Sequence, residues 1–197
     1  MRKPGNYCRD TKLTCLIAIE PGDPTIPAHL DGSIERPRKW LRTFQQGGKT
    51  TDGFMFASFC EHICGSFETH PAHGDVDKER VLMWDSNLSA QHETGLGLVY
   101  QTVEGRGGPN RFRIVCRPPY QPKVAPIENQ IVDVCYELQK RIDRQHHITI
   151  NDMEQMLYNI VGTVGGNGNF NNAFDRCGYT INGIYPPGGY DPFIRPN

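Results

Sequence analysis

The sequence has 197 residues, 37% of them hydrophobic, which suffices for one domain with a modest apolar core. Its 21 basic residues nearly balance its 22 acidic ones, which excludes a wholly basic nucleic-acid-binding protein but not a local basic surface. No apolar run reaches the roughly 18 residues of a membrane span, and the 21 glycines and 15 prolines argue against a helical bundle.

The first half of the chain predicts two strands followed by a helix. Residues 13–19 form a continuous apolar run, which is typical of a strand buried on both faces. Residues 39–44 predict another strand, with Trp40 directed inward. Thr51 or Asp52 can cap a helix whose apolar residues follow at helical spacing. Those apolar residues are Phe56, Phe59, Cys60, Ile63, Cys64 and Phe67.

Two further strands and a weak helical segment follow. Residues 81–84 predict a buried strand that ends on Asp85, and residues 111–116 predict the next strand. The weak helical pattern lies between them, near residues 92–103.

Three helices are expected after the last strand. They cover residues 127–142, residues from about 152 to 164, and a short segment near 169–176. Asn151 and Glu154 fit a capping box at the start of the second of these helices. The apolar face of the first is expected to contain Ile127, Ile131, Cys135, Leu138 and Ile142.

The alternation of strands with helices indicates a single α/β domain. We assign it to residues 13–180, with an N-terminal extension over 1–12 and a Pro/Gly-rich tail over 181–197. Seven cysteines without regular spacing, several of them inside apolar runs, indicate a reducing, intracellular compartment. Structural zinc sites favour closer cysteine pairs, so we interpret Cys60 and Cys64 as part of an apolar helix face.

Three carboxylates stand at the ends of the apolar elements. Glu20 follows the first strand, Asp85 ends a later one, and Glu128 lies in the first turn of the helix after the last strand. Ligands of open α/β sheets gather at the carboxyl ends of strands. Converging carboxylates repel one another unless cations lie between them, and their hard oxygens suit magnesium. The pattern therefore predicts one or two metal ions in a site suited to phosphodiester chemistry.

One segment connects these acids with a known family. Residues 117–129 read RPPYQPKVAPIEN and resemble the "PPYSPxxNPIE" segment of mariner-type DDE transposases and the related bacterial insertion-sequence transposases. By this resemblance Glu128 is the third metal ligand. Residues 81–92, VLMWDSNLSAQH, resemble the family's strand ending in Asp-Asn with a His shortly after it, so Asp85 corresponds to the second acid. The supporting residues by the same resemblance are Asn87, His92 and Asn129.

The resemblance implies an RNase H-like fold with a mixed central sheet flanked by helices. The sequence departs from the family in a reduced hairpin region between the first strand and the first helix, where it predicts one strand instead of two. The resemblance also implies DNA cleavage and strand transfer that depend on two magnesium or manganese ions, held by Glu20, Asp85 and Glu128. Where the family has an Asp as its first acid, this sequence has Glu20, with Asp23 as the alternative and Asp31 as a poorer one. A eukaryotic transposase of this kind would be nuclear.

Local groups of basic residues, with Trp40 and Tyr120 nearby, are suited to follow a phosphate backbone. The residues expected to contact DNA are Arg38, Lys39, Arg106, Arg111, Arg113, Arg117 and Lys123.

A second interpretation is a domesticated, catalytically inactive transposase fold that serves as a binding or structural subunit. Only twelve residues precede the first strand, so the family's helix-turn-helix modules are missing before it, and the net charge is close to zero. The motif context of Asp85 and Glu128 favours the enzyme instead. The expected partners are DNA and a second copy of the chain in a homodimer, or, in the second interpretation, a large protein or ribonucleoprotein assembly.

Overall fold

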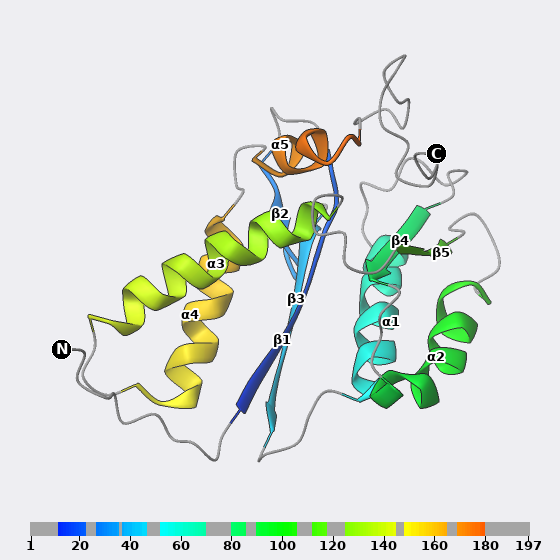
Figure 1. The fold of residues 1–197 in the computed structure, drawn as a ribbon, viewed down its shortest axis with the longest axis horizontal. Helices are drawn as coiled ribbons and strands as arrows, with labels where there is room; N and C mark the ends of the chain where they lie inside the picture. Colours follow the sequence, from blue (N-terminus) through cyan, green and yellow to red (C-terminus); the bar gives the residue numbers. More distant parts are fainter. Residues whose placement is uncertain are drawn as a thin grey trace, which may run out of the picture. The chain divides into compact units, whose positions relative to one another are not determined.

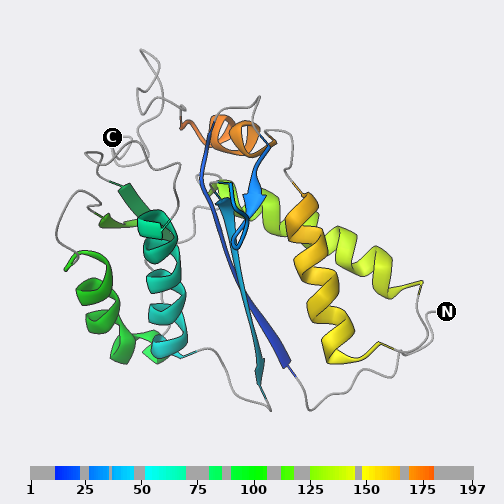
Figure 2. The same cartoon turned by 180° about the vertical axis from the view of Figure 1, so that it is seen from behind.

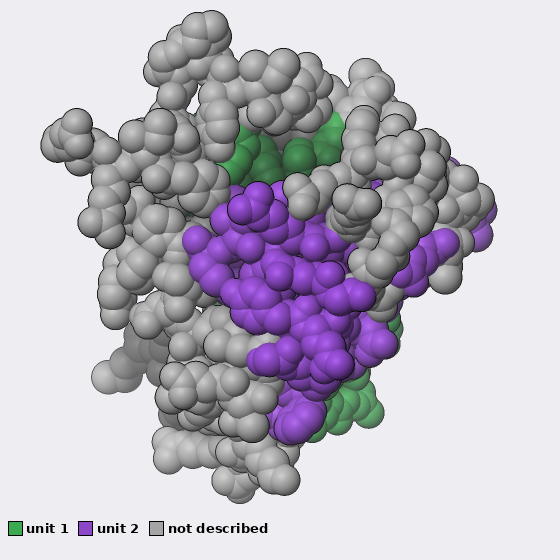
Figure 3. Space-filling view, turned by 90° about the vertical axis from the view of Figure 1, so that its right-hand side faces the viewer, with its two compact units in different colours: residues 1–30, 38–49, 122–197 green, residues 31–37, 50–121 purple. Residues whose placement is uncertain are grey.

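The computed structural model describes residues 12–22, 27–35, 37–46, 52–69, 80–85, 90–105, 112–117, 125–144, 148–164 and 169–179. Along these residues three strands come first, helices and strands then alternate, and three helices come last (Figure 1). The chain divides into two compact units, which Figure 3 colours separately. Unit 1 contains residues 1–30, 38–49 and 122–197, and unit 2 contains residues 31–37 and 50–121.

An antiparallel strand pair forms the centre of unit 1. β1 (Lys12–Ile19) pairs with β3 (Pro37–Gln46), and the two-residue strand β2 (His29–Leu30) joins the other edge of β3. The register runs from Lys12 opposite Gln46 to Ile19 opposite Lys39. Both strands predicted in this part of the chain are therefore confirmed, and β3 extends past its predicted limits at both ends.

Helices complete unit 1. They are α3 (Pro126–Ile142), α4 (Ile150–Thr163) and α5 (Asn169–Arg176), which confirms the three helices predicted after the last strand. α3 and α4 lie on one side of the β1–β3 pair (Figure 2). The core between them and the strands contains Leu41, Val134, Met156, Leu157, Ile160 and Val161.

Alternate residues of β3 share the face that meets α4, because side chains of a strand alternate between its two faces. At one end of this face the Gln45 amide donates hydrogen bonds to Asn151 Oδ1 at 2.9 Å and to Glu154 Oε2 at 3.0 Å. The Thr43 hydroxyl donates to Glu154 Oε1. These bonds fix the first turn of α4 against the C-terminal half of β3.

Lys39 fixes the opposite end of α4. Its Nζ donates to the carbonyl oxygens of Gly162 at 2.7 Å and Val164 at 3.1 Å. The last carbonyls of a helix have no partner within the helix and carry partial negative charge, so an ammonium group stabilises them. The six residue steps from Lys39 to Gln45 span about 20 Å of strand, which matches about 18 Å for the roughly twelve helix steps along α4.

The capping box of α4 lies two residues before the predicted one. Thr149 is the N-cap, and its hydroxyl accepts a hydrogen bond from the Asp152 backbone N–H at 3.1 Å. Asp152 Oδ2 accepts in return from the Thr149 backbone N–H at 2.9 Å. The predicted box of Asn151 and Glu154 is wrong, because both residues are already helical and their side chains bond to β3.

Unit 2 consists of two packed helices and a parallel strand pair. α1 (Gly53–Thr69) packs against α2 (Ala90–Val103), and β4 (Arg80–Asp85) pairs with β5 (Phe112–Arg117). Asp52 caps α1, since its Oδ1 accepts from the Met55 backbone N–H at 2.9 Å. The predicted apolar face of α1 is confirmed by the burial of Phe59, Cys60, Ile63, Cys64 and Phe67.

Three predictions about burial are wrong. Residues 13–19 of β1 are all only partly buried, so β1 is not a strand buried on both faces. Val81 of β4 is 51% exposed, so β4 is not a strand buried on both faces. On α3, Ile131 and Cys135 are exposed, whereas Gln130 and Val134 are buried. Apolar residues lie on two adjacent faces of this helix, one with Ile131 and Cys135 and one with Val134. Packing against α4 and β1 buries the face that contains Val134.

The α/β class is confirmed. Among the described residues, the antiparallel strands lie in the sheet of unit 1 and the parallel strands in that of unit 2. No helix in these ranges is long and apolar enough to cross a membrane.

Replacing Thr149 with Ala should lower the free energy of unfolding by about 1 kcal/mol, because the Asp152 backbone N–H loses its capping acceptor. Urea denaturation followed by circular dichroism measures the change. Gln155→Ala, at an exposed position of the same helix, is the matched control and should change stability by less than about 0.5 kcal/mol. Equal effects of the two substitutions would contradict the assigned cap.

Candidate functional site

Glu20 is held where β1 ends. Its backbone N–H donates to the Arg38 carbonyl at 2.9 Å, which extends the β1–β3 pairing by one residue. The side chain is partly buried, and its Oε2 atom is fully buried. The backbone of the predicted first acid is therefore fixed by its strand, and its carboxylate is partly buried.

The guanidinium of Arg38 lies against Gly22, two residues after Glu20. A Cβ atom at Gly22 would coincide with the Arg38 guanidinium, so the absence of a side chain at Gly22 is what makes room for it. A fixed positive charge thus lies beside the segment that follows the predicted first acid. Arg38, predicted to contact DNA, is partly buried in this position.

Glu128 lies in the first turn of α3, where the helix begins with Pro126. Its backbone N–H donates to the Ala125 carbonyl at 3.0 Å, and its side chain is exposed. The helix macrodipole favours a carboxylate at this position. Asn129, the predicted supporting residue, is exposed next to it.

Unit 1 contains both Glu20 and Glu128. α3 contacts β1. Figures 1 and 2 both show the start of α3 near the C-terminal end of β1. Asp85 belongs to unit 2, where it is the last residue of β4 and lies opposite Arg117 of the parallel strand β5. Both strands of that pair therefore end at the same edge.

Several predicted residues lie outside the described part of the structure. For Asp85, His92 and Arg117 the backbone is described and the side chain is not. The residues that lie wholly outside are Asp23, Asn87, Arg106, Arg111 and Lys123. Among the described side chains, no group of three His, Cys, Asp or Glu residues is placed to hold a metal ion.

Asp31, the poorer candidate for the first acid, contacts a histidine side chain. Its Oδ2 lies 2.6 Å from His62 Nε2, and the aspartate side chain is 3% exposed. Asp31 and His62 both belong to unit 2, so this contact links the segment after β2 with α1.

The described structure also agrees with the interpretation of Cys60 and Cys64 as core residues. Both are buried on α1. Burial, together with the neighbouring Cys64, raises the pKa of the Cys60 thiol to about 12. A thiol that stays protonated is a poor metal ligand and a poor nucleophile.

Lys39 does not fit its predicted role as a DNA contact. It is 1% exposed, and two backbone carbonyls of α4 accept hydrogen bonds from its ammonium group. Burial lowers the pKa of this group from 10.5 to about 8. Arg113, by contrast, is exposed on β5 and remains available to a phosphate group.

Two buried polar residues were not anticipated from the sequence. Lys39 is predicted to contact DNA, although the alternation of side chains along a strand places it on the same face as Leu41. Gln130 of α3 is 5% exposed, and its Oε1 accepts no hydrogen bond from the described residues. No pattern in the sequence distinguishes Gln130 from an exposed polar residue of a helix.

No protein-family model matches this chain, and neither a curated protein nor a solved structure matches it.

The buried ammonium of Lys39 predicts a pH dependence of stability. Between pH values of about 8 and 10.5 the unfolded chain binds a proton that the folded chain has released, so rising pH favours the folded state. We therefore compare the free energies of unfolding of the wild type and of Lys39→Met. The difference, wild type minus variant, should increase by up to about 3 kcal/mol across this pH window.

Urea unfolding of the two proteins at several pH values measures this difference, and the subtraction cancels the titration of the thiols that both share. Lys140→Met is the matched control, since Lys140 has an exposed side chain. A difference for Lys39→Met that stays constant with pH would contradict the burial of its charge.

Proposed function

We propose that this chain is an RNase H-like catalytic domain of the DDE transposase type, which cleaves and joins DNA phosphodiester bonds. The observation that carries the proposal is the order of acids and elements along the chain. Glu20 follows β1, Asp85 ends β4, and Glu128 opens the helix that follows β5. The motif RPPYQPKVAPIEN spans the passage from β5 to α3.

The proposed ligands fit a divalent cation by their chemistry. Carboxylate oxygens are the ligands that magnesium and manganese prefer. Glu128 is exposed, and the backbone of Glu20 is held at the end of β1 by its hydrogen bond to Arg38. Two such ions, when bound, would activate the attacking oxygen and stabilise the leaving one.

The residues of the chain would orient the reacting groups. Glu20, Asp85 and Glu128 would fix the position of the cations, and each is held at the end of a regular element, which limits its motion. Arg113 would contact the phosphate backbone and position the duplex without reading its sequence. Asn129 follows Glu128 on the exposed side of α3 and would donate hydrogen bonds to the substrate.

One observation favours the alternative of an inactive, domesticated fold that acts as a binding or structural subunit. The Arg38 guanidinium lies against Gly22, close in sequence to Glu20. A positive charge beside the residue two positions after the proposed first ligand opposes the binding of a cation in that segment. In this alternative the inherited fold would support a larger assembly.

Metal titration separates the two functions. Calorimetric titration with manganese should show binding to the wild type and a loss of at least about tenfold in affinity for Asp85→Asn and Glu128→Gln, because each substitution removes an anionic ligand. Asp133→Asn, an exposed acid of the same helix, is the matched control for Glu128→Gln. Glu20→Gln and Asp23→Asn compared in the same assay identify the first acid.

Absence of manganese binding to the folded wild type would overturn the catalytic proposal and favour the structural one. If binding occurs, nicking of supercoiled plasmid DNA by the wild type and not by Asp85→Asn is the expected activity.

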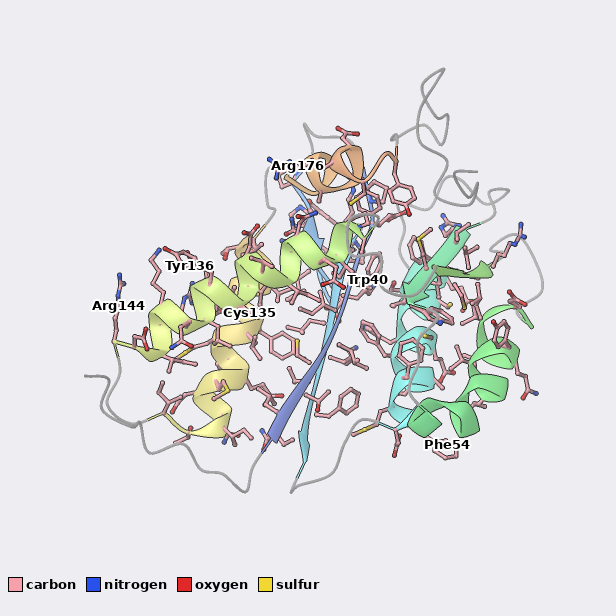
Figure 4. The ribbon with its side chains drawn as sticks, in the orientation of Figure 1. Trp40, Phe54, Cys135, Tyr136, Arg144 and Arg176 are labelled. Atoms are coloured by element: carbon pink, nitrogen blue, oxygen red, sulfur yellow. The ribbon has the colours of Figure 1, made fainter. Side chains whose placement is uncertain are left out.

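DNA binding gives an independent prediction. Arg113→Gln should weaken binding to duplex DNA and reduce the salt dependence of log K by about 0.9, the value of one lost phosphate contact. Fluorescence anisotropy of a labelled duplex over a range of salt concentrations measures both. Arg144→Gln, exposed at the far end of α3 (Figure 4) and outside the predicted contacts, should leave the slope unchanged. Equal changes would contradict a specific role for Arg113.

A further inference from the structure

Two cysteines of unit 1 lie on elements that contact each other. Cys15 belongs to β1 and Cys135 to α3, and both are free thiols. The Cα atoms of these two elements approach to within 8 Å. Cys15 packs against the core that contains Val134, and Cys135 directly follows Val134 in α3. The fold therefore brings together two thiols that lie about 120 residues apart in the sequence.

The two thiols influence each other electrostatically. Burial raises the pKa of the Cys15 thiol to about 12, and the neighbouring Cys135 adds to this rise. A charge on Cys135 acts on Cys15 only when the two groups are close, because water and salt screen charges at longer range. A disulfide joins Cα atoms roughly 4.4–6.8 Å apart, which is a separation that two elements in direct contact can reach.

The two thiols differ in their access to solvent. Cys135 is exposed on α3, where Figure 4 labels it, whereas Cys15 is partly buried. An oxidant therefore reaches Cys135 first, and Cys15 is available as the second thiol. Cys60 and Cys64 are also neighbours, but they are 2% and 0% exposed on α1, so the folded chain shields them from an oxidant. An accessible thiol beside a second one is typical of redox-sensing cysteines.

We propose that Cys15 and Cys135 form a redox switch, in which a hydroperoxide links β1 to α3 through a disulfide. In a reducing compartment both residues stay as thiols, and the link forms when peroxide is present. This inference goes beyond the proposed function and does not rest on it, because neither cysteine is a predicted metal ligand or DNA contact.

The reaction transfers two electrons from the two thiols to one peroxide molecule. The Cys135 thiolate attacks an oxygen of hydrogen peroxide and the O–O bond breaks. Cys135 becomes a sulfenic acid, and the other oxygen leaves as water with the proton that the thiol released. The sulfur of Cys15 then attacks the sulfur of Cys135, the S–O bond breaks, and hydroxide leaves with the proton of Cys15 as a second water. Cys15 is a weak nucleophile while protonated, and its proximity to the sulfenic sulfur compensates for this.

The disulfide would hold α3 on an edge strand of the sheet of unit 1. It closes a loop of about 120 residues, which restricts the unfolded chain and so stabilises the folded one. Cys135 lies about two helical turns after Glu128. The link therefore also restrains the helix whose first turn contains Glu128.

Peptide mapping tests the proposal. The full chain in EDTA, at micromolar concentration, is treated with an equimolar amount of hydrogen peroxide, and the remaining thiols are alkylated. A tryptic digest analysed without reduction should contain the peptide 13–38 linked to the peptide 124–140. Cys15→Ser and Cys135→Ser should each abolish this product, and dithiothreitol should reverse its formation. Cys116→Ser, which removes an exposed cysteine of unit 2, is the matched control and should leave the yield unchanged.

Urea unfolding gives a second measurement. The oxidised wild type should unfold at a higher urea concentration than the reduced protein, and Cys135→Ser, altered at an exposed position, should show no such shift. Failure of the folded wild type to form the linked peptides would overturn the proposal. So would a disulfide that joins Cys135 to a second chain or to a cysteine other than Cys15. Because EDTA removes metal ions, this result and that of the manganese titration are independent.

Discussion

A buried ammonium group fixes the position of α4 on the sheet of unit 1. The charge of Lys39 is removed from water, which is unfavourable unless hydrogen bonds compensate for the loss. The carbonyl groups at the end of α4 supply that compensation. If α4 moved along β3, the buried charge would lose these acceptors. Gln45 fixes the other end of the helix. α3 packs on α4, so the position of Glu128 depends on the same contact.

The residues of the candidate site are positioned in a different way, because each of them lies at the end of a strand or a helix. The positions of Glu20 and Asp85 are set by the ends of β1 and β4, and that of Glu128 by the start of α3. Because a strand or helix end orients the next residue through its backbone, each acid is placed by local structure. The distribution of the acids over the two units is a property of the fold, since unit 1 contains Glu20 and Glu128 and unit 2 contains Asp85.

The sequence by itself determined the α/β class, the identity of the helices and of every described strand except the two-residue β2, and the apolar face of α1, because periodicity and caps such as Asp52 act within a few residues. It also placed each candidate acid at the end of an element. Tertiary packing alone decided which row of α3 is buried, that the side chains of Asn151 and Glu154 bond to β3, and that Lys39 lies inside. A strand covered on both faces buries neighbours such as Lys39 and Trp40 together, and no local pattern shows what covers the second face.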